Sequence, residues 1–441
     1  MSPDSFFSSD LGNANNDILS VRRCVDDDTP ALTEPAVTPT PTPIVTPTNI
    51  SIDGVYSWGS NTAGQLGINS DNAIGRYPFK ISDANATTII KSGRDHNLVL
   101  HNGDIYYMGT NEDTLSQSGT IVKNITKLTV DIADSTTWSR IATNTHHSLV
   151  VGTTGAVYGF SNDFNYGSTG HTAQTGTFTQ VAVTGGVHFV GAEIEAGDFH
   201  SLAIGADANV YAWGRNNVGQ LGNNSIQDTA VHHQAAIVSG ISEAAHIYTN
   251  ADTNACYAIN TSGTLYSWGG VQDTTNPTSG TQHILGRADG DPLNVGNVLL
   301  PQRARYFSTG NDLNIVILKD YSLYMWGTFY DSTGALKTIE TPTPIIHNDS
   351  LEGIQGFRVS SQTHTNNTFR SALYVGFDTR LYFLTPVSYD GVYVKAGLQL
   401  ISNDLNISSL SSGPDHYMAI KLNTANIYSL PHSDSLIGEV I

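Results

Sequence analysis

Histidine recurs at one position of a repeated pattern, and that position limits the chemistry that the chain could carry. A Gly-x-x-His element, with one degenerate copy, ends in His96, His147, His200 and His416. A residue type that recurs at one position indicates a shared packing or hydrogen-bonding role rather than a single active site. No His-x-x-x-His or Cys-x-x-Cys spacing occurs, so we predict no metal site.

Motifs for catalysis are absent or weak. No Gly-x-Ser-x-Gly motif of a nucleophilic serine occurs. Gly-rich phosphate loops need a strand-to-helix junction, and the sequence contains no convincing amphipathic helix. Glu193 and Glu195 share a strand face, but no other feature marks them as an acid and base pair. We therefore predict a non-enzymatic protein without catalytic residues and without a cofactor.

The elements that must position the histidines are repeats of roughly fifty residues, a period typical of stacked supersecondary units. Each repeat contains a short apolar run, a turn rich in Asn and Gly, and a second run built on a tyrosine, which predicts a β-hairpin. In a strand, residues two apart share a face, so Tyr211 and Trp213 should pack together against a neighbouring sheet. The tyrosines that mark the copies are Tyr56, Tyr106, Tyr158, Tyr211, Tyr266, Tyr324, Tyr382 and Tyr428.

Two copies are nearly identical and reveal a family resemblance. Residues 55–67 read Val-Tyr-Ser-Trp-Gly-Ser-Asn-Thr-Ala-Gly-Gln-Leu-Gly, and residues 210–222 repeat this pattern. The pattern resembles the RCC1-type β-propeller family, named for the regulator of chromosome condensation, over residues 53–430. The resemblance implies an all-β, seven-bladed propeller with an N-terminal extended arm. The eighth tyrosine copy fits a closed ring in which the strand at residues 55–58 joins the last blade.

The resemblance also implies a binding face. In RCC1-like exchange factors, acidic and histidine residues of the Gly-x-Asp-His elements face a small GTPase, and a wedge-like loop is needed for exchange. The longest insertion here, residues 272–298, shows no matching motif. The alternative is that these residues only brace the turn before each strand. The candidate contact residues are Asp95, His96, Asp198, His200, Asp415 and His416.

Composition excludes several classes of function. The net charge of −19 disfavours nucleic acid and anionic membranes, because phosphate contacts need Lys and Arg. No run of residues reaches transmembrane length, and the N-terminus lacks the features of a signal peptide. The two cysteines, Cys24 and Cys256, do not suggest a disulfide framework, and Cys256 is expected to be a small buried apolar residue.

Three segments are expected along the chain. Residues 1–28 form a polar N-terminal anchor peptide, residues 29–52 a Thr/Pro-rich linker, and residues 53–441 the RCC1-like propeller. Alternating Thr and Pro favours a semi-rigid polyproline II spacer, which suggests attachment to a larger protein assembly. A tail without a role is the alternative. The apolar residues of the anchor are Phe6, Phe7, Leu11, Ile18, Leu19 and Val21.

Three functions compete. The first, which these features favour, is a virion component, such as a phage fibre, tail or head-decoration protein. It would be made in the host cytoplasm, attach through the arm, and present the propeller to a host-surface glycan or protein or to other copies of itself. The second is an RCC1-like exchange factor or regulatory partner of a small GTPase in the cytoplasm. The third is a hydrolase that acts through the central channel, for which the sequence offers no residues.

Overall fold

The computed structural model describes most of the repeat region and none of the arm. The predicted anchor and linker segments, Asp415 and Tyr428 lie outside the described residues, so their roles stay predictions. No helix in the described parts of the chain has the length and apolarity to span a membrane. The described residues are 53–110, 121–128, 137–161, 166–170, 178–183, 191–227, 232–249, 254–270, 282–288, 291–310, 313–348, 352–361, 372–376, 380–402, 407–413 and 416–422.

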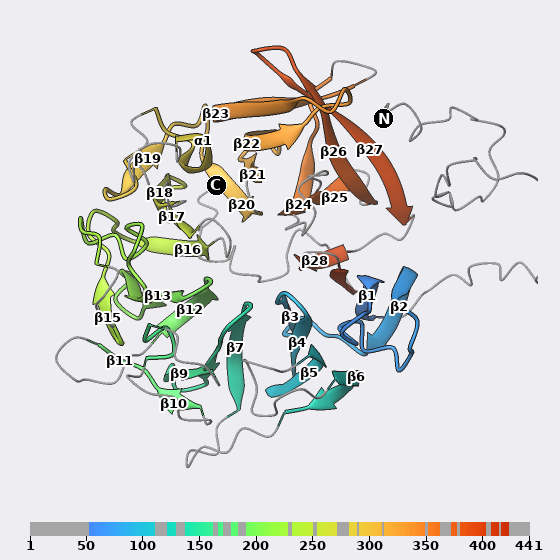
Figure 1. Cartoon of the computed structure of the whole chain (residues 1–441), viewed down its shortest axis with the longest axis vertical. Helices are drawn as coiled ribbons and strands as arrows, with labels where there is room; N and C mark the ends of the chain where they lie inside the picture. The colour runs from blue at the N-terminus through green and yellow to red at the C-terminus, as the bar shows by residue number, and fades with distance from the viewer. Residues whose placement is uncertain are drawn as a thin grey trace, which may run out of the picture.

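Short antiparallel blades follow one another around a ring (Figure 1). We name each blade by its first strand. The β3 blade contains β3 (Ile89–Ser92), β4 (His96–His101), β5 (Asp104–Thr110) and β6 (Ile121–Lys127). The β7 blade contains β7 (Trp138–Thr143), β8 (Ser148–Gly152), β9 (Val157–Phe160) and β10 (Thr179–Gln180). The β12 blade contains β12 (Gly191–Ala196), β13 (His200–Gly205), β14 (Val210–Gly214) and β15 (Gln234–Ile237), and β11 (Ala182–Val183) pairs with β15 in parallel.

The second half of the ring departs more from the repeat. The β16 blade contains β16 (Ala244–Thr249), β17 (Ala255–Asn260), β18 (Leu265–Gly269) and β19 (Gly296–Val298), with helix α1 (Gln282–Leu285) inserted before β19. The β20 blade contains β20 (Ala304–Thr309), β21 (Leu313–Leu318), β22 (Leu323–Tyr330) and β23 (Leu336–His347). The β24 blade contains β24 (Gly356–Ser361), β25 (Ala372–Gly376), β26 (Leu381–Tyr389) and β27 (Val394–Ser402).

The two ends of the repeat region share one blade, as the sequence predicts. This closing blade contains β28 (Ile407–Ser412), β29 (His416–Lys421), β1 (Gly54–Ser60) and β2 (Ile74–Ser82). Strand β1 pairs with β29 in continuous antiparallel register from Gly54 opposite Lys421 to Gly59 opposite His416. Backbone hydrogen bonds between the chain ends therefore close the ring, and few strand edges are left unpaired.

The all-β propeller fold is confirmed, whereas the number of blades stays a prediction. The described strands form six sheets, because β23 pairs with β27 in parallel and joins the β20 and β24 blades into one eight-stranded sheet. The hairpins β22–β23 and β26–β27 extend beyond the neighbouring strands at the top of Figure 1. Their contact also includes a hydrogen bond from the Ser332 N–H to the Val387 carbonyl.

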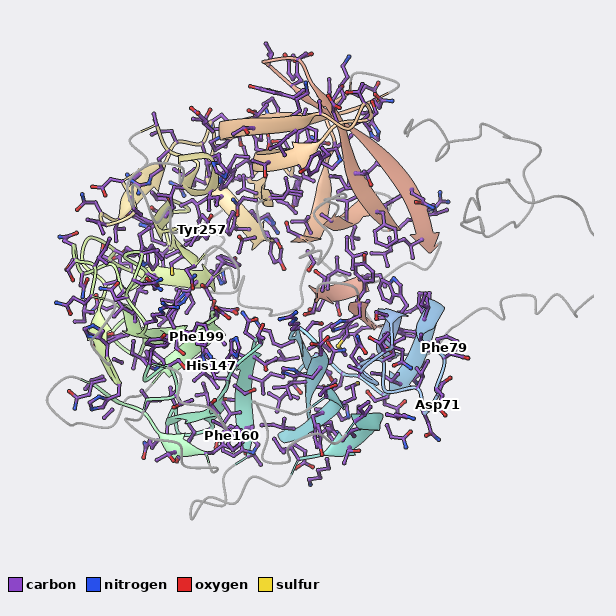
Figure 2. The ribbon with its side chains drawn as sticks, viewed as in Figure 1. Asp71, Phe79, His147, Phe160, Phe199 and Tyr257 are labelled. Atoms are coloured by element: carbon purple, nitrogen blue, oxygen red, sulfur yellow. The ribbon has the colours of Figure 1, made fainter. Side chains whose placement is uncertain are left out.

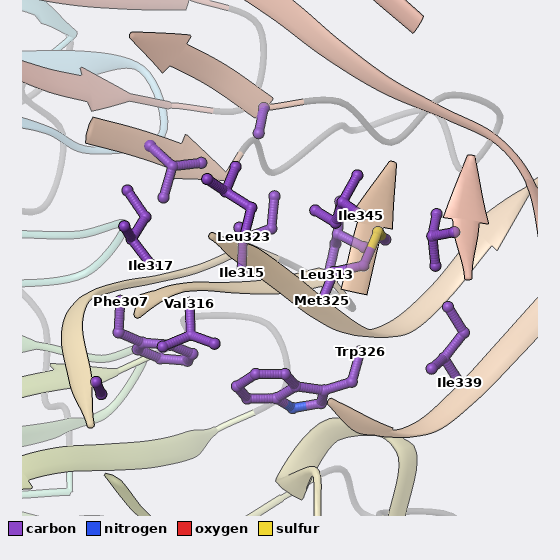
Figure 3. Packing of buried hydrophobic residues seen from close by; sticks show 14 of the residues in the cluster. Phe307, Leu313, Ile315, Val316, Ile317, Leu323, Met325, Trp326, Ile339 and Ile345 are labelled. Atoms are coloured by element: carbon purple, nitrogen blue, oxygen red, sulfur yellow. The ribbon is translucent and has the colours of Figure 1, made fainter. Parts of the chain in front are cut away.

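Apolar side chains fill the space between adjacent blades. Trp213 packs with residues of the β7 blade, and Trp268 packs with residues of the β12 blade. The largest cluster joins the β16, β20 and β24 blades, where Phe307 and Trp326 stack with ring centroids 5.5 Å apart (Figure 3). The predicted role of the aromatic residues in sheet-to-sheet packing is confirmed. Each blade is too thin to form a core alone, so its stability depends on its neighbours.

The closing blade gives a first prediction. Removal of residues 1–52 should leave the melting temperature unchanged, because the ring begins at β1. Removal of residues 1–60 deletes β1, separates β2 from β29 and exposes two strand edges, so cooperative unfolding should be lost. Differential scanning calorimetry of the two truncated chains checks this. Equal melting curves would contradict the role of β1 in closing the ring.

Candidate functional site

The repeated histidines are buried between blades. His147, His200 and His416 are fully buried, and His96 is 4% exposed. The glycine of each Gly-x-x-His element lies against the imidazole, because a Cβ atom added at Gly93, Gly197 or Gly413 would overlap the histidine ring that follows. The glycine N–H also donates to the histidine carbonyl in all three copies, at 2.8–3.0 Å. The glycine of the motif therefore leaves the space in which the histidine ring packs against a tight turn.

Each histidine reaches from its own blade to the next one. We call these contacts the histidine bridges. They connect the closing blade to the β3 blade and then, in order, the β3, β7, β12 and β16 blades. The Nε2 atoms contact Asn97 Oδ1 at 2.9 Å from His416, Thr143 Oγ1 at 2.6 Å from His96, Ser201 Oγ at 2.8 Å from His147, and Thr249 Oγ1 at 2.7 Å from His200.

Neighbouring bonds fix the tautomer of two bridges. The Ser201 hydroxyl donates to the Ser168 carbonyl, so it must accept the bond from His147. The Asn97 amide group donates its NH₂ to the Gln65 carbonyl, which leaves its oxygen to accept from His416. Both histidines therefore carry a proton on Nε2.

Burial keeps the bridge histidines neutral. It lowers the pKa of His96 and His200 to about 4, and that of His147 and His416 to about 3, from the ordinary value of 6.5. The charged forms are disfavoured because the rings are out of water, and neighbouring histidines add a smaller repulsion at His147 and His416. The predicted hydrogen-bonding role of the repeated histidines is confirmed.

A second link between blades uses backbone carbonyls of the Gly-Gln-Leu-Gly loops. Each carbonyl accepts hydrogen bonds from side chains of the following blade, among them the indole N–H of its tryptophan where one is present. The acceptor and donor atoms are Gln65 O with Asn97 Nδ2 at 2.6 Å, Ser168 O with Trp213 Nε1 at 2.7 Å, Gln220 O with Trp268 Nε1 at 3.0 Å, and Ile284 O with Trp326 Nε1 at 2.8 Å.

Two of these loops are not recognisable from the sequence. Residues 167–170 read Gly-Ser-Thr-Gly, and residues 283–286 read His-Ile-Leu-Gly inside the insertion that shows no motif. The bonding group is a backbone carbonyl, so most side chains of the loop can vary. What persists is a final glycine at positive φ, as at Gly286, where a Cβ atom would lie 2.8 Å from Trp326 Cε2.

The carboxylate pair on β12 is used in contacts between blades. The Glu195 carboxylate forms an ion pair with Lys91 of β3. Glu193 accepts the Ile247 N–H at 3.0 Å and lies 3.4 Å from His246 Nδ1. The two carboxylates therefore bind different neighbours, and this geometry offers no support for the hydrolase hypothesis.

The predicted binding residues do not form one exposed set. The buried histidines His96, His200 and His416 bond to the next blade and leave no side-chain surface for a partner, so their assignment as contact residues is corrected. Asp95 and Asp198 lie in the exposed turns, with side chains 54% and 27% exposed. Of the described candidates, only these two aspartates keep exposed side-chain surface.

A cluster of aromatic and charged side chains surrounds Asp198 where the β7 and β12 blades meet. We call it the Phe199 cluster. His146 stacks on Phe199 at 4.3 Å between ring centroids, and Tyr166 meets Phe199 edge to face at 5.5 Å. The guanidinium of Arg215 lies 4.5 Å from the Tyr166 ring centroid, and Asp198 Oδ1 lies 3.3 Å from His146 Nε2. Figure 2 shows Phe199 beside His147 on the inner half of the ring.

The backbone holds the Phe199 cluster in place. The Arg215 N–H donates to the Phe199 carbonyl at 2.8 Å. Tyr166 has a φ of 51°, in the left-handed region that bulky residues rarely adopt. The sequence did not reveal this cluster, because its members come from four loops and follow no periodic pattern.

No group of three metal-binding side chains occurs within the described ranges. Cys256 is fully buried, and burial raises the pKa of its thiol far above the ordinary value. Its sulfur lies 3.2 Å from His200 Nε2 and donates to the Gln220 carbonyl at 3.5 Å. The thiol is therefore part of the packing between blades, as expected, and not a reactive nucleophile.

Comparison with known proteins agrees with this geometry. The family model of the regulator of chromosome condensation (RCC1) repeat matches residues 53–100 and, in a second form, residues 192–220. The human E3 ubiquitin-protein ligase HERC2 is 24% identical over 300 residues, which are 65% of this chain and 6% of HERC2. The Protein RCC2 homolog of Xenopus laevis is 23% identical over 310 residues, which are 63% of this chain and 56% of that protein.

A solved structure extends the likeness to nearly the whole ring. Prp20p from Saccharomyces cerevisiae aligns with a TM-score of 0.65 at 16% identity, covering 86% of this chain and 93% of Prp20p. At this identity the likeness establishes the fold alone. The chain spans only a small part of HERC2 and about half of the RCC2 homolog, so the activities of those whole proteins do not transfer with the match.

The histidine bridges predict a specific cost for losing an acceptor. Ser201→Ala should lower the free energy of unfolding by about 1–3 kcal/mol, because the buried Nε2–H of His147 loses its partner. The control is Ser225→Ala, at a partly exposed serine whose hydroxyl bonds to Asn223 of its own loop, and its cost should stay within about 0.5 kcal/mol. Urea denaturation measures both, and equal effects would contradict the role of the bridge.

The carbonyl loops predict different outcomes at two glycines with positive φ. Gly286→Ala should cost about 3 kcal/mol, because backbone strain adds to overlap with Trp326. Gly240→Ala should cost only about 1 kcal/mol, because the nearest atom to its Cβ is Val295 Cβ at 3.9 Å. Urea denaturation of both variants checks the difference, and a smaller loss for Gly286→Ala would contradict it.

Stability should fall in mild acid. The folded pKa of each bridge histidine lies below the unfolded value, so the unfolded chain takes up protons first as the pH drops below 6.5. At about pH 5 each histidine should lower the free energy of unfolding by about 2 kcal/mol. His147→Gln should reduce this pH dependence by the same amount. Urea denaturation of the parent chain and the variant, near neutral pH and at about pH 5, tests this prediction. An unchanged pH dependence in the variant would refute it.

Proposed function

We propose, from the premise that the chain is an RCC1-like β-propeller repeat protein, that it is a protein-binding regulator rather than a catalyst. Its partner would be a small GTPase, and the ring would bind it through the face that carries the Gly-x-x-His turns. The fold and the relatives support protein binding in general. We further propose that the partner is a small GTPase and that the chain stimulates its nucleotide exchange.

The relatives support a protein-binding regulator more than a virion component that displays the propeller. They include the proteins named RCC1 and RCC2 homolog, and Prp20p is described with its binding to Gsp1p and histones. Nothing in the comparisons supports a virion component. Attachment through residues 1–28 and display on a particle stay a prediction, and mass spectrometry of particles from the source organism would test it.

The observation that carries the proposal is the Phe199 cluster. Tyr, Phe and Arg side chains that are partly exposed and held rigidly are typical of the residues that dominate protein interfaces. The rings of His146, Tyr166 and Phe199 restrain one another, and the Arg215 backbone bonds to Phe199, so little side-chain entropy would be lost on binding. Asp95 and Asp198 lie in the Gly-x-x-His turns of the β3 and β12 blades, and their carboxylates would add polar contacts to a partner.

Charge suggests how a partner would approach. The net charge of −19 would steer a partner with a basic contact surface towards the ring and repel an acidic one. Binding of this kind has an association rate that falls with added salt, whereas the contacts of the Phe199 cluster would set the dissociation rate.

The experiment measures release of a fluorescent GDP analogue from a purified small GTPase, and binding to that GTPase and to Gsp1p, the protein named as a binding partner of Prp20p, by surface plasmon resonance. The full chain should bind and accelerate release. Phe199→Ala combined with Arg215→Ala should weaken binding at least about tenfold, because hot-spot residues contribute most of the affinity.

The control is Phe79→Ala, at an exposed phenylalanine on the outer strand β2 (Figure 2), which should bind like the unaltered chain. Melting curves must agree for all variants. Binding without accelerated GDP release would contradict the exchange activity. Equal binding by the double variant would reject the Phe199 cluster as the site, and no binding to the GTPase would reject it as the partner.

A further inference from the structure

The histidine bridges occupy only part of the ring. They connect four successive interfaces, from the closing blade to the β16 blade. In the β16 and β20 blades the matching positions hold Ala255 and Leu313, both buried in the largest apolar cluster. One arc of the ring therefore adds neutral imidazoles to its apolar packing, whereas the β16 and β20 blades have apolar side chains at these positions.

The groups that face the bridges are other histidines and neutral side chains. His96 faces His416, and both His146 and His200 face His147. The carboxylate of Asp198 pairs with His146, and Asn254 lies beside His200. Around the bridges, the described contacts place no carboxylate on a bridge ring, so a proton there would meet no compensating charge.

The tight turns also leave a protonated imidazole no room to move towards water. The Nδ1 atoms of His147, His200 and His416 are buried without a hydrogen-bond partner within the described residues. Burial disfavours the charged ring, and the ring cannot move away because a glycine turn lies against it at His200 and His416. Separation of the two blades is the route by which a charged imidazole reaches water.

We propose that mild acid opens the ring along the histidine-bridged interfaces while the interfaces among the β16, β20 and β24 blades stay closed. The opening is a property of the fold and does not depend on the function proposed above. It makes the ring a conformational switch with a fixed location, namely the arc from the closing blade to the β16 blade.

Cys256 is a built-in reporter of one bridged interface. It is fully buried, and its sulfur lies 3.2 Å from His200 Nε2. When the β12 and β16 blades separate, the thiol becomes accessible. A full chain with Cys24→Ser has this one cysteine left, so labelling by 4,4′-dithiodipyridine, a reagent that still reacts in mild acid, reports the opening.

The labelling rate of Cys256, corrected for the reagent's own pH dependence, should rise about 15-fold between pH 6.5 and pH 5, the ratio expected for protonation of one histidine in the open state alone. His200→Gln, which can still bond to Thr249 but cannot be charged, should abolish this rise. His147→Gln, at another interface, should retain it. A flat rate in the parent chain, or the same rise in His200→Gln, would overturn the proposal.

Hydrogen–deuterium exchange of the unaltered chain provides a measurement that does not depend on variants. At about pH 5, corrected for intrinsic rates, exchange should accelerate in β4, β8 and β13 and stay slow in β21 and β25. Equal acceleration in all five strands would show global loosening and would overturn the restriction to one arc.

Discussion

The structure depends on one constraint, which is that thin blades find partners for most of their buried N–H groups on a neighbouring blade. A four-stranded sheet has no interior, so its tryptophans and histidines become buried only at an interface. Their N–H groups then need acceptors across that interface. The chain supplies these acceptors as loop carbonyls and as hydroxyl or amide side chains, such as Ser168 for Trp213 and Ser201 for His147.

Glycine makes these links geometrically feasible. Where a histidine ring or a tryptophan ring contacts the neighbouring backbone, a Cβ atom would collide with it, as at Gly197 and Gly286. The two sequence signatures, Gly-x-x-His and Gly-Gln-Leu-Gly, thus both form hydrogen bonds that join consecutive blades. The function proposed for the ring builds on the rigidity that results, because the Phe199 cluster lies beside such a joint.

The sequence predicts the repeated parts well and the isolated parts poorly. Tyrosine spacing and hairpin turns predict the strands, and the matched ends predict the pairing of β1 with β29. The loop at Ser168 and the loop at Ile284 escape detection because a backbone carbonyl does the bonding. The parallel contact of β23 with β27 and the Phe199 cluster arise from segments that follow no period, so only the folded chain brings them together.

NMR of the histidine side chains in the intact protein tests most directly whether the repeated histidines lie buried and neutral between the blades. Nitrogen shifts across a pH titration report both the tautomer and the pKa of each ring. We expect His147 and His416 to carry their proton on Nε2 and to have pKa values of about 3, with His96 and His200 at about 4. Four pKa values near 6.5 would contradict it, since they would place these rings in water and not between blades.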